Sequence, residues 1–434
     1  MERPLLAAIP FRRDSVSGVK CTSMSVSAVG PLRRVKAAIV QYPVVMKLQE
    51  IQAALRSRHI DAWLFYDHHH RDPIAYRVLG LAGELFVTRR WFYLIPAEGE
   101  PRKLVHRIEN GHLDSLPGNK QEYSSYKELA AALGAMLQGQ KTVAMQYSPQ
   151  NMVPYLGLVD AGTVELVRSL GAEVVTSGDL VAEFEAVWTP EQIASHFAAG
   201  RIVDRITEEA FREIGRRVRH GGTSEFAVQQ WIDEALRREG LTNENDPPIV
   251  AVNANSGNPH YSPAAEGAAP IRAGDFVLLD IWAKQSAPGA VYYDITWTGF
   301  AGAAPPERLC GIFRIVRGAR DAGVSTVQEA VAAGRRLCGW EVDEAVRGVI
   351  ERAGYGRYFV HRTGHSIGEA LHGNGANLDN LETRDERAIL ANSCFSVEPG
   401  IYLPEFGVRS EVDVLVRERN AEITGKIQQE IVII

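Results

Sequence analysis

Ionisable side chains stand inside strongly apolar segments in the C-terminal half of this 434-residue chain. Asp280 ends the run Phe-Val-Leu-Leu-Asp, and Glu398 directly follows Phe-Ser-Val. A carboxylate inside an apolar strand is costly unless a cation or a metal ion compensates its charge. Asp294 and Glu411 stand in comparable segments, and the glycine-flanked His365 lies between them in the sequence. Any fold of this chain must provide that compensation, so we expect strands that converge on one charged centre.

Four carboxylates and one imidazole form a ligand set that suits two adjacent divalent ions, because about four negative charges balance about four positive charges. Hard oxygen donors with a single nitrogen favour manganese or a similar ion over a thiolate zinc site. Two such ions can share and ionise one water, which gives a nucleophile for hydrolysis. The pattern therefore predicts a dinuclear metallohydrolase. The cofactors that we expect are two divalent metal ions, with manganese first and cobalt or zinc as alternatives.

Length and composition narrow the class of protein. Single hydrophobic cores rarely grow beyond roughly 250–300 residues, so two domains are expected. The apolar runs are shorter than the roughly 18 residues that a membrane span needs, and we expect no membrane association. A net charge of −6 argues against a nucleic-acid partner. The four cysteines lie far apart without a CxxC pair, which favours a reducing, cytoplasmic location.

The first 45 residues differ in character from the rest of the chain. Basic residues outnumber the acidic Glu2 and Asp14 there, and no hydrophobic period is sustained. We expect residues 1–45 to form a poorly ordered extension, and a targeting peptide remains an alternative. Next, helical patterns at 48–58, 127–137 and 153–161 alternate with strand patterns at 62–66, 90–95, 142–145 and 173–175. This alternation predicts a small α/β domain over residues 46–185.

Residues 186–434 show one order of elements twice. Thr189 supplies a capping oxygen, Pro190 follows it, and Gln192 lies three positions after the cap, which predicts a helix start. A second helix is expected over 224–238, followed by the strand pair that carries the first carboxylates. Two more helical patterns and a second carboxylate-bearing strand pair follow Pro306 at nearly the same spacing. We therefore expect an internal repeat, although α/β chains can also repeat such an order by chance.

Three segments together carry a resemblance to a known family. They are His361-x-x-x-His365 followed by His372, then Glu398-Pro-Gly-Ile-Tyr, and then Val-Arg-x-Glu411-x-Asp-Val. From about residue 46 to the C-terminus the chain resembles the pita-bread metallopeptidases, which comprise Xaa-Pro aminopeptidases, prolidases and methionine aminopeptidases. The resemblance implies an α/β N-terminal domain plus an α+β pita-bread catalytic domain with an internal pseudo-twofold repeat. The N-terminal domain favours the Xaa-Pro aminopeptidase and prolidase branch.

The resemblance also implies a role for each metal ligand. Asp280 is expected to chelate one ion, and His365 and Glu398 the other. Asp294 and Glu411 are expected to bridge both ions. Glu398 would in addition handle the proton of the bridging water, which makes it catalytic as well as a ligand.

Further site residues follow from the same resemblance. His260 and His372 match catalytic histidines that hydrogen-bond the substrate and the tetrahedral intermediate, and His361 matches a histidine that lines the substrate pocket. Neutral or protonated imidazole can donate to a developing oxyanion, so these roles are physically reasonable. Arg409 shares a strand face with Glu411 and is expected either to orient the ligand shell or to form a plain salt bridge.

The function implied is that of a dinuclear-metal-dependent exopeptidase that hydrolyses the bond before proline with a metal-bridging hydroxide. We expect a proline-containing peptide substrate and a homodimer. Many prolidases hold the dipeptide carboxylate with an arginine soon after the histidine matched by His372, whereas Arg384 and Arg387 come later here. Two alternatives stay open. One is hydrolysis of another amide or amidine, as in creatinase, and the other is a non-catalytic peptide-binding protein.

Overall fold

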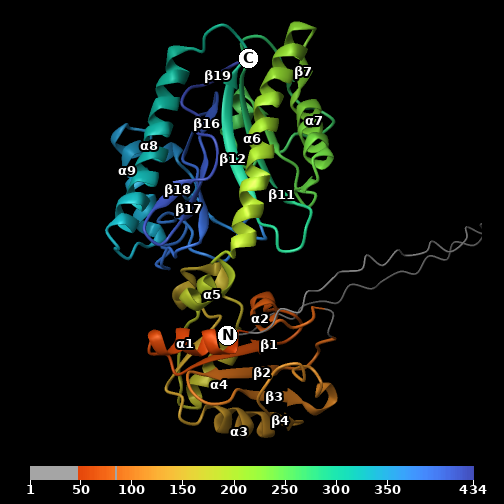
Figure 1. Ribbon diagram of the computed structural model, residues 1–434, viewed down its shortest axis with the longest axis vertical. Coiled ribbons are helices and arrows are strands. Elements are labelled where there is room, and N and C mark those ends of the chain that lie inside the picture. Colours follow the sequence, from red (N-terminus) through yellow and green to blue (C-terminus); the bar gives the residue numbers. More distant parts are fainter. Residues whose placement is uncertain (1–46, 84–85) are drawn as a thin grey trace, which may run out of the picture. The chain divides into compact units, whose positions relative to one another are not determined.

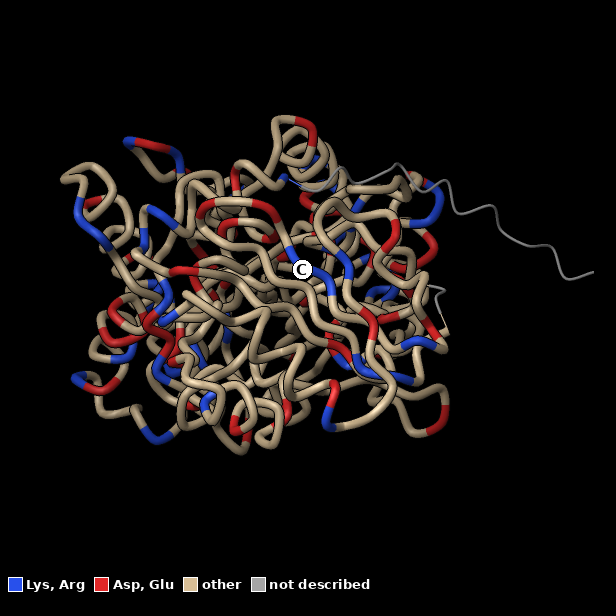
Figure 2. Tube along the Cα trace, turned by 90° about the horizontal axis from the view of Figure 1, so that it is seen from below, with Lys and Arg blue, Asp and Glu red and all other residues tan. Residues whose placement is uncertain are grey.

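The structure is a computed structural model that describes residues 47–83 and 86–434. The extension predicted over residues 1–45 lies outside the described residues, so that prediction stays untested. No helix in the described ranges is both long enough and apolar enough to cross a membrane. Lys and Arg are interspersed with Asp and Glu along the trace in the view of Figure 2, in keeping with the small net charge of −6.

A six-stranded sheet forms the first part of the chain that the structure describes. Its strands are β1 (Ala62–Asp67), β2 (Trp91–Pro96), β3 (Arg102–His106), β4 (Asn119–Tyr123), β5 (Thr142–Met145) and β6 (Glu173–Thr176). The helices are α1 (Leu48–Ser57), α2 (Pro73–Leu79), α3 (Tyr126–Leu137), α4 (Ala161–Ser169) and α5 (Gly178–Glu185). Short 3-10 turns are η1 (Arg107–Glu109), η2 (Pro149–Asn151) and η3 (Pro154–Leu156). The strand order β4-β3-β2-β1-β5-β6 places the fully buried β1 between antiparallel β2 and parallel β5.

The helix predicted over residues 153–161 is wrong, whereas the other elements predicted for this part form close to their expected bounds. The segment holds only the turn η3, and α4 begins at Ala161. Asp160 has an extended backbone and caps α4 by accepting a hydrogen bond from the Thr163 amide at 2.9 Å. Leu156 and Val159 are buried although the segment is irregular, which explains the misleading apolar pattern.

Two long helices and a strand pair make up the first half of the remaining chain. The elements are α6 (Pro190–Arg219), β7 (Thr223–Ser224), α7 (Glu225–Arg238), β8 (Leu241–Thr242), β9 (Ile249–Val252), η4 (Asn253–Gly257), β10 (Pro270–Ile271), β11 (Phe276–Gln285) and β12 (Tyr293–Phe300). The predicted helix start is confirmed. The Thr189 side chain accepts from the amide of Gln192, and the Gln192 side chain accepts from the amide of Thr189. This reciprocal cap satisfies amides at the helix end that would otherwise lack partners.

The second half repeats that order. Its elements are α8 (Glu307–Ala332), α9 (Gly339–Arg352), η5 (Gly356–Tyr358), β13 (Ser366–Ile367), β14 (Cys394–Val397), β15 (Gly400–Tyr402), β16 (Gly407–Arg409), β17 (Val412–Val416), β18 (Ala421–Ile423) and β19 (Val432–Ile433). Figure 1 shows α6 and α7 on one side of the strands and α8 and α9 on the other. Each helix pair buries its apolar face in its own core with the neighbouring strands. The predicted repeat of two helices and carboxylate-bearing strands is therefore present.

The central strands fix the positions of the charged residues. β11 pairs with β12 in an antiparallel register that sets Asp280 opposite Thr296 and Asp294 opposite Trp282. β14 pairs antiparallel with β17, and Glu398 and Glu411 lie at the adjoining ends of these two strands. The side chains of β17 are buried along the whole strand, so its register is held by packing on both faces.

Candidate metal and active site

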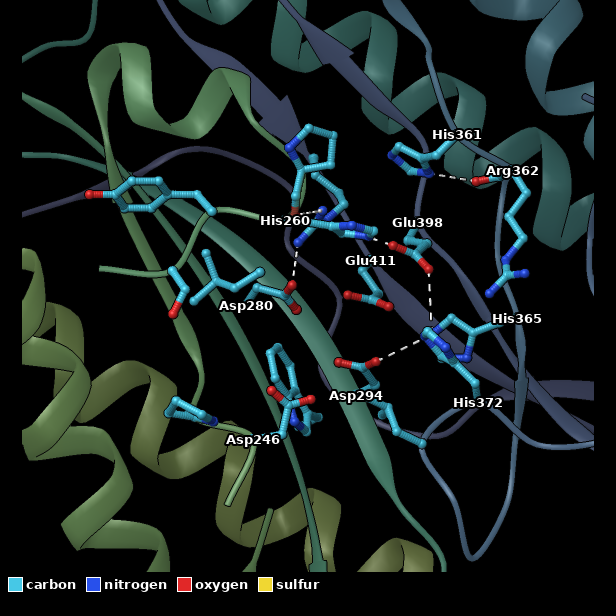
Figure 3. A pocket seen from close by; sticks show the side chains of 18 of the residues that line it. Asp246, His260, Asp280, Asp294, His361, Arg362, His365, His372, Glu398 and Glu411 are labelled. Carbon is cyan, nitrogen blue, oxygen red and sulfur yellow. Dashed lines mark hydrogen bonds and ion pairs between the residues drawn. The ribbon is translucent and has the colours of Figure 1, made fainter. Parts of the chain in front are cut away.

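One cavity of about 430 Å³ brings together the predicted metal ligands, the predicted catalytic and substrate-binding histidines, and Arg409. The predicted site residues that line it are His260, Asp280, Asp294, His361, His365, His372, Glu398, Arg409 and Glu411. They come from β11, β12, β16 and the loops that flank β13, β14 and η4. Figure 3 shows the carboxylates in the middle of this cavity with the histidines around them. The segments that were predicted to converge therefore line one cavity.

The carboxylates and the imidazole approach one another closely. Ligand atoms of Asp294, His365 and Glu411 all lie within 4.8 Å of one another. These three side chains and Asp280 are buried. In the described part of the chain, one oxygen each of Asp294 (Oδ1) and Glu411 (Oε1) is buried without any hydrogen-bond partner. Buried polar atoms without partners are rare in native proteins, and such atoms are positions where an ion can bind.

Burial makes it costly to ionise these groups together. Desolvation raises the pKa of Asp280 to about 6 and the pKa of Asp294 to about 7. It also raises the pKa of Glu398, and it raises the pKa of Glu411 well above its usual range, where Asp294 adds like-charge repulsion. A bound divalent cation inverts this situation, because it favours the ionised form of every carboxylate around it.

His365 is oriented to offer one lone pair to the centre. Its Nδ1 lies 3.2 Å from the backbone carbonyl oxygen of Ser366, and since a carbonyl oxygen only accepts, Nδ1 carries the proton. Its Nε2 therefore presents a lone pair, 3.6 Å from Asp294 Oδ2 and 3.6 Å from Glu398 Oε1. Burial lowers the pKa of His365, which keeps the ring neutral. Acceptors that face one another at this distance leave room for a cation.

Glycine at position 364 is needed for this placement. A Cβ on Gly364 would overlap the backbone oxygen of Ser396 in the neighbouring strand β14. The Ser396 hydroxyl in turn accepts from the backbone amide of His365 at 3.0 Å. The close approach of the two backbones therefore holds the histidine at the edge of the strand that leads to Glu398.

Arg409 contacts several members of the site, and of the two roles expected for it the structure favours the orienting one. Its guanidinium forms a short ion pair with Asp280 and lies 3.9 Å from Glu398 Oε2. Its Nε donates to the hydroxyl of Thr296 at 2.9 Å. That hydroxyl lies 2.7 Å from Glu411 Oε2 and 3.1 Å from Asp280 Oδ1. Arg409 and Thr296 thus link two of the carboxylates, which one plain salt bridge would not do.

The three further histidines differ in environment. His361 is tied down, with Nε2 2.6 Å from the Tyr402 hydroxyl and Nδ1 2.6 Å from the backbone carbonyl oxygen of Arg362. His372 packs edge-on against His365, with ring centroids 4.2 Å apart. Burial lowers the pKa of both His361 and His372 to about 3, so both rings are neutral at physiological pH. His260 is exposed in the loop after η4 and lines the cavity.

Several cavity residues were missed in the sequence. No signal pointed to Asp246 or Trp282 as residues that line the cavity, or to Thr296 as a hydrogen-bond partner of Asp280 and Glu411. Arg362, beside His361, also lines the cavity and donates to the Tyr155 hydroxyl at 2.8 Å. Arg384 and Arg387, considered as carboxylate-binding candidates, line a different cavity. Arg387 is paired with Asp385 at 2.5 Å, and Arg384 stacks on Trp340.

Residues 198–418 match the description of metallopeptidase family M24. This chain belongs to metallopeptidase family M24. Family membership implies divalent metal ions as cofactors, and the donor set described above fits them. Hard carboxylate oxygens dominate, one imidazole nitrogen joins them, and two buried oxygens lack protein partners.

Relatives and solved structures agree with this assignment. The M24 chain is 32% identical over 237 residues to the "Putative Xaa-Pro aminopeptidase" of Mycoplasma pneumoniae, which covers 53% of this chain. The chain spans 61% of the length of that relative. Dipeptidase PepE from Mycobacterium ulcerans has a similar structure, with 24% identity, a TM-score of 0.62, and coverage of 89% of this chain and 96% of that chain. The structure of Xaa-Pro dipeptidase from Bacillus anthracis is also similar, with 24% identity and a TM-score of 0.59. The match covers 90% of this chain and 100% of that chain. These likenesses confirm the pita-bread fold with an N-terminal α/β domain.

Proposed function

We propose that this M24 chain is an exopeptidase that depends on two metal ions and cleaves the peptide bond before proline. One observation carries the proposal: the predicted ligand residues share one cavity, and two of their buried oxygens lack partners. The name of the Mycoplasma relative, a putative Xaa-Pro aminopeptidase, supports the same substrate class. We place the division between the two domains at residues 46–185 and 186–434, between the end of α5 and the start of α6.

The ligand roles in this proposal are those that the resemblance to the pita-bread metallopeptidases implies. Asp280 would hold one ion, His365 and Glu398 would hold the other, and Asp294 and Glu411 would serve both. Manganese is the proposed ion because oxygen donors outnumber nitrogen, and cobalt and zinc are the alternatives. When bound, the ions supply Lewis-acid activation of water and of the substrate carbonyl.

The chain itself handles protons and orients the substrate. Glu398 lines the cavity, with one carboxylate oxygen 3.6 Å from His365 Nε2, and is the residue proposed to take the proton of the attacking water. His372 is neutral at physiological pH and donates one N–H to the oxyanion that develops on the substrate carbonyl. His260, across the cavity, is proposed to bind the substrate. His361, whose Nε2 lies 2.6 Å from the Tyr402 hydroxyl, is proposed to line the substrate pocket.

The test is a panel of Xaa-Pro dipeptides, Xaa-Pro-Yaa tripeptides and proline-free controls, assayed with manganese and again after chelation. The proposal expects cleavage of the proline peptides that chelation abolishes and manganese restores. Cleavage of dipeptides alone would assign the chain to the prolidases, and cleavage of tripeptides to the aminopeptidases. Full activity after verified metal loss, or the absence of cleavage of every proline peptide, would contradict the proposal.

A further inference from the structure

The cavity wall includes the acidic Asp246 and the basic Arg362, and the acidic Glu382 lies near enough to Arg362 to raise its pKa. In the view of Figure 3, Asp246 lies on one side of the central carboxylates and Arg362 on the other. Both residues line the same cavity. A short peptide has a positive N-terminus and a negative C-terminus. A peptide bound with its carboxylate at the Arg362 guanidinium places its N-terminal residue on the side of Asp246.

The Asp246 carboxylate is paired with no side chain in the part of the chain that the structure describes. It lies between β8 and β9, and its backbone amide donates to the Asn243 carbonyl at 3.0 Å, so the loop is closed on itself. Within residues 47–83 and 86–434, its side chain makes no hydrogen bond or ion pair. Partial burial raises the pKa of Asp246, and no cation acts on it to lower that pKa. Its charge is therefore available to a ligand.

The neighbouring acidic residue of the same loop is in a different situation. Glu244 is exposed but forms an ion pair with Lys284 at 2.6 Å. Lys284 Nζ also lies 4.7 Å from the centre of the Tyr292 ring and contacts the backbone oxygen of Glu369. Lys284 is thus already held by other groups. Glu244 does not line the cavity, whereas Asp246 does.

Apolar side chains accompany Asp246 in the cavity wall. Ile249, Trp282 and Leu371 line the same cavity, and Trp282 is 7% exposed. A wall of this kind accepts a hydrocarbon stem, and a carboxylate at its edge accepts a positive charge at the end of that stem. Lysine and arginine side chains combine these two features, since their methylene groups bury while the charged group stays at the polar edge.

We propose that Asp246, with Ile249, Trp282 and Leu371, forms a subsite that selects lysine or arginine as the residue before proline. This inference rests on the proposed peptidase function and names its substrate class. The exposed position of Asp246 limits the size of the effect through solvent screening, and about a fivefold preference for the charged side chain is expected. The preference should weaken in high salt, because salt screens exposed charges.

The experiment compares kcat/KM for Lys-Pro and norleucine-Pro, whose side chains are alike except for the ammonium group. We expect the wild type to prefer Lys-Pro by about fivefold at low ionic strength. Asp246→Asn should reduce this ratio to about one, and Asp246→Lys should reverse it. Glu244→Gln removes the same charge from the same loop outside the cavity and should leave the ratio as in the wild type.

Two results would overturn the inference. The first is a ratio of kcat/KM for the two peptides that Asp246→Asn leaves unchanged. If kcat/KM falls equally for both peptides, Asp246 binds the backbone ammonium of the peptide and not the side chain. The second is a change of the ratio in Glu244→Gln as large as that in Asp246→Asn. It would show that the overall negative charge of the loop, and not a subsite at Asp246, produces the preference. The failure of the proposed function looks different, because neither peptide would then be cleaved by the metal-loaded wild type.

Discussion

Thr296 offers a sharp test of how the carboxylates are held in place. Its hydroxyl has one hydrogen, which points to Glu411 Oε2 at 2.7 Å or to Asp280 Oδ1 at 3.1 Å, and it accepts from Arg409 Nε at 2.9 Å. Thr296→Val keeps the shape of this fully buried side chain but removes the hydroxyl. A hydrogen bond to a charged group contributes about 1.5–3 kcal/mol. The loss of the bond that orients Glu411 should therefore weaken metal binding by roughly one to two powers of ten.

The assay is calorimetric titration of metal-free protein with manganese. Thr296→Ser keeps the hydroxyl and should bind nearly as the wild type does. Thr298→Val removes a buried hydroxyl two positions along β12, which lies 3.4 Å from Gln428 and contacts no ligand residue. It should bind metal as tightly as the wild type. A Thr296→Val dissociation constant within about threefold of the wild-type value, in a folded protein, would refute the reasoning.

Three other predictions concern stability and turnover. Burial lowers the pKa of His196 to about 4, so the unfolded chain binds a proton more readily, and stability is lost as pH falls from 6.5 toward 4. Between pH 8 and pH 5 the free energy of unfolding of the wild type should fall by about 2 kcal/mol because of His196. The His196→Asn variant should lack this part of the fall, as measured by urea unfolding. Gly364→Ala should lower the free energy of unfolding by about 3 kcal/mol, whereas Gly318→Ala in α8, with open space around it, should not lower it. His372→Ala should keep its metal and lose two to three powers of ten in turnover, and normal turnover would disprove its role.

The candidate site could be predicted from the sequence because burying its charged groups costs free energy unless another charge compensates them. Charged residues such as Asp280 and Glu411 inside apolar strands need compensation, and this need is visible without coordinates. Helix caps such as Thr189 were equally visible, since capping depends on residues a few positions apart. The ligand residues therefore met in one cavity as expected.

Other features depend on contacts between distant segments and left no local signal. Thr296 acquires its place from the β11–β12 register, which sets it opposite Asp280. Asp246 stands in an ordinary polar loop, and only the folded structure shows that it lines the same cavity as the ligand residues. The wrong helix over residues 153–161 has a similar origin. Leu156 and Val159 are buried by tertiary packing, and a periodic pattern alone cannot distinguish that packing from a helix.

The most direct test of the account is the metal content of purified protein, measured by mass spectrometry after equilibration with manganese and removal of free ions. The account predicts about two ions per chain in the wild type, because four carboxylates and one imidazole match that charge. Glu411→Gln should retain fewer than about one, since Glu411 is proposed to contact both ions. A fully active wild type without bound metal, or a Glu411→Gln variant that retains both ions, would contradict the central claim.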